Sequence, residues 1–166
     1  AGTKQVVATA GTALTESHLK ALNRFTGDIR LAFDQDKAGL AATERAIPIA
    51  NRVGVMLGIV TIPSGKDPDE LIKQDPSAWQ KALDASQYAL DWLVDRYAAQ
   101  QDLTSATGKR AFSDATLQVV RQLADHVEQD HYLGVIAEKS GISRQALEQK
   151  LKGVDATQQP TLRKSK

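Results

Sequence analysis

Cysteine is absent from this chain of 166 residues. Without cysteine, the chain can form neither a disulfide bond nor a zinc or iron–sulfur site with thiolate ligands. A chain free of cysteine is typical of a reducing compartment, and we therefore expect a cytoplasmic protein.

Long hydrophobic runs are absent as well. The longest apolar run, 55–62, is much shorter than the roughly 18 residues that a membrane helix needs. No charged segment followed by an apolar one precedes the first predicted strand, so the sequence indicates no leader peptide. We expect no membrane partner, and the shares of apolar residues (42%) and charged residues (25%) are ordinary for a globular protein.

An excess of charge of one sign is also lacking, since 21 Lys and Arg residues are balanced by 20 Asp and Glu residues. The net charge is +1. A protein that held nucleic acid mainly through this chain should carry a marked basic excess. The balance therefore weighs against these residues being the main nucleic-acid surface.

Residues 1–74 alternate between strand patterns and helix patterns. A short buried strand is predicted at 5–10, and a helix capped by Thr15 follows with three apolar residues on one face: Leu19, Leu22 and Phe25. A nearly all-apolar segment at 55–62 is typical of a parallel strand that is covered on both faces. This order implies right-handed crossovers and an α/β fold with a doubly wound sheet.

The segment 31–39, with the sequence LAFDQDKAG, is the centre of this half. An apolar strand ends there in Asp34 and Asp36, and a helix should begin at Lys37 or Ala38 and run to about residue 52. Open α/β sheets bind their ligands beyond the carboxyl ends of the strands. The two acids are therefore placed where such a sheet carries its chemistry.

Two carboxylates at this spacing suit a hard cation such as Mg²⁺, which takes one or two protein carboxylates and completes its shell with water and phosphate oxygens. Asp36 has an alternative role as the N-cap of the following helix. Asp34 has no obvious partner, and a buried carboxylate without one is costly. The residues alone leave the role of Asp36 open.

A second acidic segment, 64–70, follows the strand predicted at 55–62. In a parallel sheet its Asp67 and Asp69 would lie at the same edge as the first acid pair. The alternative is that Asp67 is a turn residue and that Asp69 caps a short helix. Convergence of two acid pairs on one edge favours a metal site.

Residues 75–153 carry helical patterns throughout, and the polar segment 154–166 has the composition of a linker. We expect Trp79 and Trp92 to belong to the core rather than to stack on bases. The three histidines show no metal-ligand spacing and are expected at the surface or in caps: His18, His126 and His131.

Segment 133–147 has the outline of a helix-turn-helix, with a Gly stop and a Ser143 cap between two helices. Its second helix would present donors with a carboxylate among them to DNA: Arg144, Gln145, Glu148, Gln149, Lys150 and Lys152. A DNA-binding module is therefore an alternative function for this half, although the outline alone is not specific.

Three segments resemble the Toprim core of bacterial replicative primases of the DnaG type: 7–15, 31–39 and 63–70. The resemblance implies a partial Toprim α/β subdomain at 1–74, an all-α helical bundle at 75–153 and a linker at 154–166. It also implies four ligands for Mg²⁺ or Mn²⁺: Asp34, Asp36, Asp67 and Asp69. The family's usual Asp-Gly-Asp is Asp-Gln-Asp in this chain.

The resemblance further implies parts that this chain does not contain. The family's acidic glutamate ends a strand upstream of the segments seen here, so no residue of this chain can be assigned as catalytic. A zinc-binding module, a basic part of the polymerase domain and a C-terminal helicase-binding domain are likewise expected outside it. We therefore expect a fragment that is inactive by itself.

The function that the resemblance implies is DNA primase, a nucleotidyltransferase and DNA-directed RNA polymerase of the primosome. The parent protein would join ribonucleoside triphosphates into an RNA primer on a single-stranded DNA template during DNA replication, and would meet the replicative helicase. Two metal ions would assist the transfer. One alternative is another Toprim-type nuclease or a phosphotransferase with Asp34 as nucleophile, and the other is the helix-turn-helix module.

Overall fold

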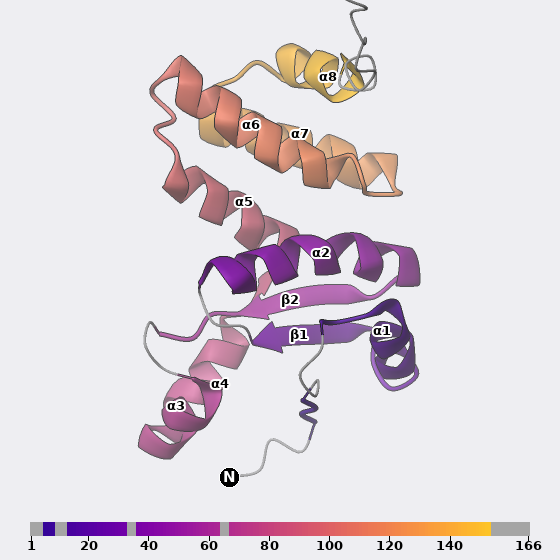
Figure 1. The fold of residues 1–166 in the computed structure, drawn as a ribbon, viewed down its shortest axis with the longest axis vertical. Coiled ribbons are helices and arrows are strands. Elements are labelled where there is room, and N and C mark those ends of the chain that lie inside the picture. Colours follow the sequence, from indigo (N-terminus) through magenta and orange to yellow (C-terminus); the bar gives the residue numbers. More distant parts are fainter. Residues whose placement is uncertain (1–4, 9–12, 33–35, 64–66, 154–166) are drawn as a thin grey trace, which may run out of the picture. The chain divides into compact units, whose positions relative to one another are not determined.

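The computed structural model describes residues 5–8, 13–32, 36–63 and 67–153. They belong to two compact units, one up to Arg96 and the other from Tyr97 onward. Figure 1 shows a small sheet with flanking helices, followed along the chain by helices only. Within the described ranges, no helix is both long enough and apolar enough to cross a membrane.

A small mixed sheet organises the first unit. The parallel pair β1 (Asp28–Ala32) and β2 (Met56–Val60) is extended by a short antiparallel strand, β3 (Gln87–Tyr88), in the order β1-β2-β3. Four helices complete the unit before the chain enters α5 (Ala89–Gln100): α1 (Glu16–Asn23), α2 (Lys37–Val53), α3 (Pro68–Gln74) and α4 (Pro76–Asp84). The predicted class, α/β followed by helices, is confirmed.

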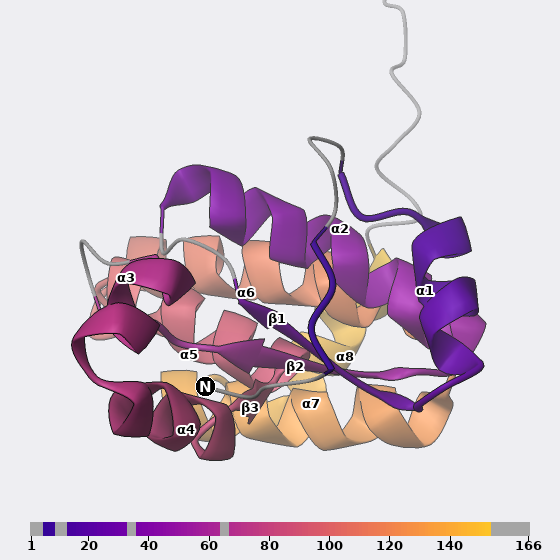
Figure 2. The ribbon, with the colours of Figure 1, turned by 90° about the horizontal axis from the view of Figure 1, so that it is seen from below.

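The core of this unit forms where β2 and α2 pack together, with α2 running alongside the strands in Figure 2. In β1, buried Ile29 stands between exposed Asp28 and Arg30, as expected of a strand with one covered face. The apolar side chains that α2 and β2 bury are Ala46, Ile47, Ala50, Leu57, Ile59 and Val60. Burial of this stripe fixes α2 against the sheet.

Local signals placed α2 correctly. The helix begins at Lys37 directly after its cap, contains Pro48 and ends at Gly54, whose φ of 78° is the left-handed conformation that glycine adopts without strain. The strand predicted at 55–62 is shorter, since β2 covers Met56–Val60, but Val55 and Ile62 on either side of it are buried too.

Two expectations for the first thirty residues are wrong. Residues 5–8 form no strand, and Val6 and Val7 are 64% and 69% exposed, while 9 and 10 lie outside the described residues. An apolar pair cannot form a strand without a neighbour to pair with. Phe25 is 87% exposed because α1 ends at Asn23, two residues before Phe25 could join the face of Leu19.

The predicted core role of the tryptophans is confirmed. Trp79 of α4 is 8% exposed and belongs to a cluster with Val60, Ile62 and Leu71. Trp92 of α5 is 9% exposed, and the guanidinium of Arg96 lies 5.8 Å from its ring centre. Neither ring is presented to solvent as a stacking platform.

The second unit continues from α5 through α6 (Ala106–Val120), α7 (His126–Ser140) and α8 (Arg144–Gly153). Its core contains the apolar side chains of Phe112, Leu117, Val120, Ile136 and Leu147, together with the polar Thr116. At the corner before α6 the backbone approaches Gly108 so closely that a Cβ there would lie 1.9 Å from the carbonyl oxygen of Asp102. Only glycine fits this position.

Candidate functional site

The candidate site lies at the carboxyl edge of the parallel strand pair. Since β1 and β2 run in the same direction, the segments that follow them leave the sheet at one edge. Figures 1 and 2 show the beginnings of α2 and α3 at the arrowhead end of the strands. Asp34 lies outside the described residues, whereas Asp36, Asp67 and Asp69 are described.

Asp36 is the N-cap of α2. Its backbone is extended, and its Oδ1 accepts a hydrogen bond of 2.8 Å from the backbone N–H of Gly39. The first N–H groups of a helix have no hydrogen-bond partner within the helix, and the positive end of the helix dipole lies there. A carboxylate is therefore stabilised at this position. The capping role considered from the sequence is therefore real, and it uses one of the two carboxylate oxygens.

Asp67 caps α3 in the same way. Its Oδ1 accepts a hydrogen bond of 2.7 Å from the backbone N–H of Glu70, and Pro68 occupies the first helical position, where no N–H is needed. The alternative weighed from the sequence had made Asp69 the cap and Asp67 a turn residue. The structure assigns the cap to Asp67, because α3 begins at Pro68.

Asp69 is paired with a lysine one helical turn further on. Its Oδ2 lies 2.5 Å from Nζ of Lys73, and both side chains are 72% exposed. The hydrogen bond to Asp69 raises the pKa of the Lys73 ammonium, and the charges of Asp67 and Glu70 act in the same direction. Sequence analysis did not single out Lys73, although the i,i+4 spacing of an acid and a lysine could have indicated it.

These residues fit a divalent hard cation by their chemistry, since carboxylate oxygens are the ligands that Mg²⁺ prefers. All three described acids are exposed at the residue level, and capping occupies only one oxygen of Asp36 and one of Asp67. The described part of the chain contains no preassembled group of three or more metal-binding side chains.

The histidines contribute nothing to such a site among the residues described. His18 closes a capping box with Thr15 at the start of α1, with hydrogen bonds in both directions. His126 Nδ1 lies 3.1 Å from the side-chain oxygen of Gln129, and the ring of His131 meets that of Tyr132 edge-on. The expected capping role is confirmed for His18.

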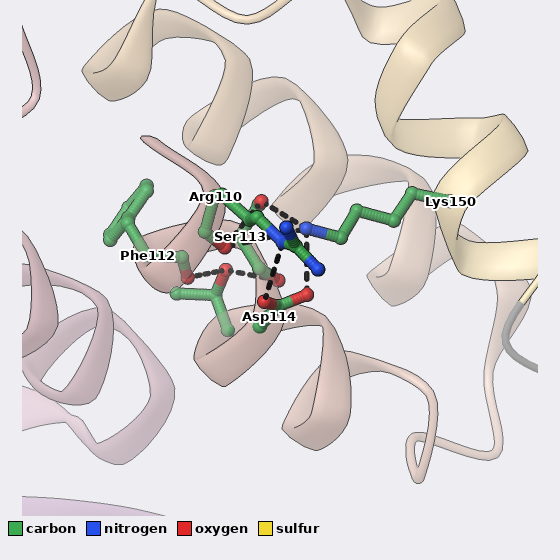
Figure 3. A network of polar contacts seen from close by, with 6 residues as sticks. Arg110, Phe112, Ser113, Asp114 and Lys150 are labelled. Atoms are coloured by element: carbon green, nitrogen blue, oxygen red, sulfur yellow. Dashed lines mark hydrogen bonds and ion pairs between the residues drawn. The ribbon is translucent and has the colours of Figure 1, made fainter. Parts of the chain in front are cut away.

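The helix-turn-helix outline is present in the second unit, but two of its expected DNA donors, Arg144 and Lys150, are engaged in ion pairs within the protein. Gly141 ends α7 with a φ of 68°, and Ser143 Oγ accepts from the N–H of Ala146 at the start of α8. Arg144 forms ion pairs with Asp130 and Glu148. Lys150 binds three oxygen atoms of α6, as Figure 3 shows. Both charges are thus used to hold α8 in place.

Two family models match the chain. A model described as Toprim-like matches residues 1–72, and a model described as the DnaB-helicase binding domain of primase matches residues 90–145. The second match overlaps α5, α6 and α7, which lie in the segment interpreted from the sequence as a supporting bundle. A segment similar to that model therefore lies within this chain, whereas the resemblance described above implies helicase binding outside it.

Curated relatives cover most of the chain. The DNA primase of Clostridium acetobutylicum is 32% identical over 147 residues, which are 88% of this chain and 24% of the relative. The DNA primase of Synechococcus elongatus is 34% identical over 146 residues, which are 84% of this chain and 21% of the relative. The chain thus spans about a quarter of the length of these two relatives.

Solved structures give the same result. The crystal structure of the Aquifex aeolicus primase, with its zinc-binding and RNA polymerase domains, matches with a TM-score of 0.62 and 27% identity. The match covers 84% of this chain and 33% of that one. The comparisons favour neither a phosphotransferase with an aspartate nucleophile nor a DNA-reading helix-turn-helix.

Proposed function

We propose that this chain, which belongs to the bacterial DnaG-type primase family, is the part of a DNA primase whose carboxylates hold the divalent metal used in RNA primer synthesis. One observation carries the proposal: the parallel strands β1 and β2 bring two acid-capped helices to one sheet edge. The relatives named above are DNA primases that match across more than four-fifths of the chain.

The proposed ligands are Asp34, Asp36, Asp67 and Asp69, and the proposed ion is Mg²⁺ or Mn²⁺. A bound divalent ion would supply positive charge for the phosphates of an incoming nucleotide. Asp36 and Asp67 are held by their caps, so that each carboxylate keeps its orientation when the site fills. Asp69 lies in the first turn of α3, where Lys73 pairs with its Oδ2 and leaves Oδ1 for the metal.

The proposed partners follow from the family. Ribonucleoside triphosphates would bind at the acid edge, and single-stranded DNA would be the template. The family match over residues 90–145 supports a contact between the helical segment and the replicative helicase. That segment contributes most of the buried side chains of the second unit, so its helices form an ordered surface for a partner.

The test is a hybrid enzyme. The segment of the Clostridium acetobutylicum primase that matches this chain is replaced by this chain, and primer synthesis on single-stranded DNA is measured with Mg²⁺ present. The hybrid should make primers. Asp34→Ala or Asp67→Ala should lower the rate of primer synthesis by about a hundredfold or more, because a metal ligand is lost. Asp84→Ala, which removes an exposed acid of α4, is the matched control.

A hybrid that folds but makes no primers, or one in which Asp84→Ala is as damaging as Asp67→Ala, would contradict the proposal. Circular dichroism of each variant separates loss of function from loss of fold. Restoring the relative's own segment in the same hybrid backbone provides the positive control.

A further inference from the structure

Lys150 is the most completely bonded cation of α8. Its Nζ lies 2.7 Å from Oγ of Ser113, 2.7 Å from Oδ1 of Asp114 and 3.3 Å from the carbonyl oxygen of Arg110 (Figure 3). A lysine ammonium has three N–H donors and no acceptor, so these three oxygens satisfy it completely. The side chain is 28% exposed, compared with 41% for Arg144 on the same helix.

The three oxygens belong to one turn of α6 and are tied to each other. The hydroxyl of Ser113 donates to the carbonyl oxygen of Arg110 at 3.0 Å, and Nε of Arg110 lies 4.0 Å from Oδ2 of Asp114. The receiving site is thus assembled by α6 alone, and α8 supplies only the ammonium. Loss of the positive charge would leave Asp114 with a distant, 83% exposed guanidinium as its remaining recorded ion-pair partner.

The rest of the attachment of α8 is mostly polar as well. Leu147 is the buried side chain of this helix, whereas α6 and α7 each bury several. Arg144 pairs with Asp130 of α7, and Nε of Arg121 donates to the carbonyl oxygen of Leu151 at 3.3 Å. Exposed ion pairs of this kind contribute little each and weaken in salt.

We propose that the positive charge of Lys150 holds α8 against α6 and α7. We further propose that α8 detaches and unfolds as a unit while α6 and α7 stay folded. Elements with few buried apolar contacts open at lower free energy than the core does. Neutralisation of Lys150, as acetylation of its amine would cause, removes the ammonium on which all three contacts depend. The positive charge of Lys150 therefore governs the attachment of α8.

The test is hydrogen exchange followed by mass spectrometry on the full chain, with Lys150→Gln as the neutral mimic of the acetylated side chain. Amides of α8 should exchange roughly three- to tenfold faster than in the unmodified chain, while amides of α6 and α7 keep their rates. Lys152→Gln is the matched control, because it removes the charge of an exposed lysine on the same helix. Lys152→Gln should leave the amide exchange rates of α6, α7 and α8 unchanged.

A second variant, Asp114→Asn, removes the acceptor instead of the donor and should reproduce the faster exchange of α8. High salt should speed up amide exchange in α8 more in the unmodified chain than in Lys150→Gln. The reason is that salt screens the ion pair of Lys150, which the variant has already lost. Unchanged exchange of α8 in Lys150→Gln would overturn the proposal. An equal increase in the amide exchange rates of α6, α7 and α8 would also overturn it, because α8 would then open only together with the whole unit.

Discussion

Asp36 and Asp67 are equivalent: each is the N-cap of the helix that follows one of two neighbouring parallel strands. Each uses Oδ1 to accept from the backbone N–H three residues later, at 2.8 Å for Asp36 and 2.7 Å for Asp67. The cap leaves the other oxygen of each carboxylate for a cation. Capping and metal binding are therefore compatible roles of one side chain, and substitutions can separate them.

The first prediction separates the two roles at Asp36. Serine is as good an N-cap as aspartate but is a poor ligand for a hard cation. Asp36→Ser should therefore keep the free energy of unfolding within about 0.5 kcal/mol of the original, whereas Asp36→Ala should lower it by about 1 kcal/mol. Both variants should bind Mn²⁺ more weakly. Urea unfolding and calorimetric titration measure the two effects, and full Mn²⁺ affinity in Asp36→Ser would remove Asp36 from the ligand set.

The second prediction concerns the lysine that occupies Asp69. A divalent ion at Asp69 would be repelled by the neighbouring ammonium of Lys73, so Lys73→Met should bind Mn²⁺ about twofold more tightly, the equivalent of one weak exposed ion pair. The control is Lys20→Met, which breaks the similar i,i+4 pair with Glu16 at 2.7 Å, away from the acid edge. Equal affinity in Lys73→Met and the original chain would show that Asp69 is not a ligand.

The third prediction tests the corner before α6. Gly108→Ala places a methyl group against the carbonyl group of Asp102, and backbone rather than a flexible side chain must move. We expect a loss of about 2 kcal/mol or more in the free energy of unfolding, as for overpacking in a core. Gly27→Ala is the control, because a Cβ there meets nothing within 4 Å. Thermal denaturation of both variants checks the difference.

The fourth prediction concerns pH. The hydroxyl of Thr104 donates to Asp102 at 2.6 Å and its backbone N–H at 3.0 Å, and these bonds hold the pKa of the Asp102 carboxyl below its ordinary 3.8. A lowered folded pKa stabilises the fold above the ordinary value, and this contribution is lost as the pH falls through the lowered one. NMR titration of the carboxyl carbon should give a midpoint below 3.8. A midpoint at or above that value would contradict the bonded geometry.

Local chemistry made much of the fold predictable. The cap at Asp36 acts within a few residues, and α2 begins at Lys37 and ends close to residue 52, as the sequence indicates. Strand pairing is not local: the apolar residues 5–8 form no strand in the structure. The bond from Lys150 to Ser113 joins residues 37 apart, so no short pattern could reveal it.

The candidate site was predictable in its residue types but not in their partners. Acids after two apolar strands indicated one edge, and the parallel pairing of β1 with β2 places Asp36 and Asp67 there. The metal role of the four aspartates stays a prediction, and Asp34 lies outside the described residues. The pairing of Asp69 with Lys73 depends on side-chain rotamers at an exposed i,i+4 position, which the order of the acids along the chain does not specify.

The most direct measurement is a titration of the isotope-labelled chain with Mn²⁺, followed by NMR. The account predicts that line broadening appears first at the amides of Gly39 and Glu70, which donate to the two capping aspartates, and that it disappears in Asp34→Ala. Broadening spread evenly over all surface acids, or unchanged in Asp34→Ala, would contradict a metal site at the carboxyl edge of β1 and β2.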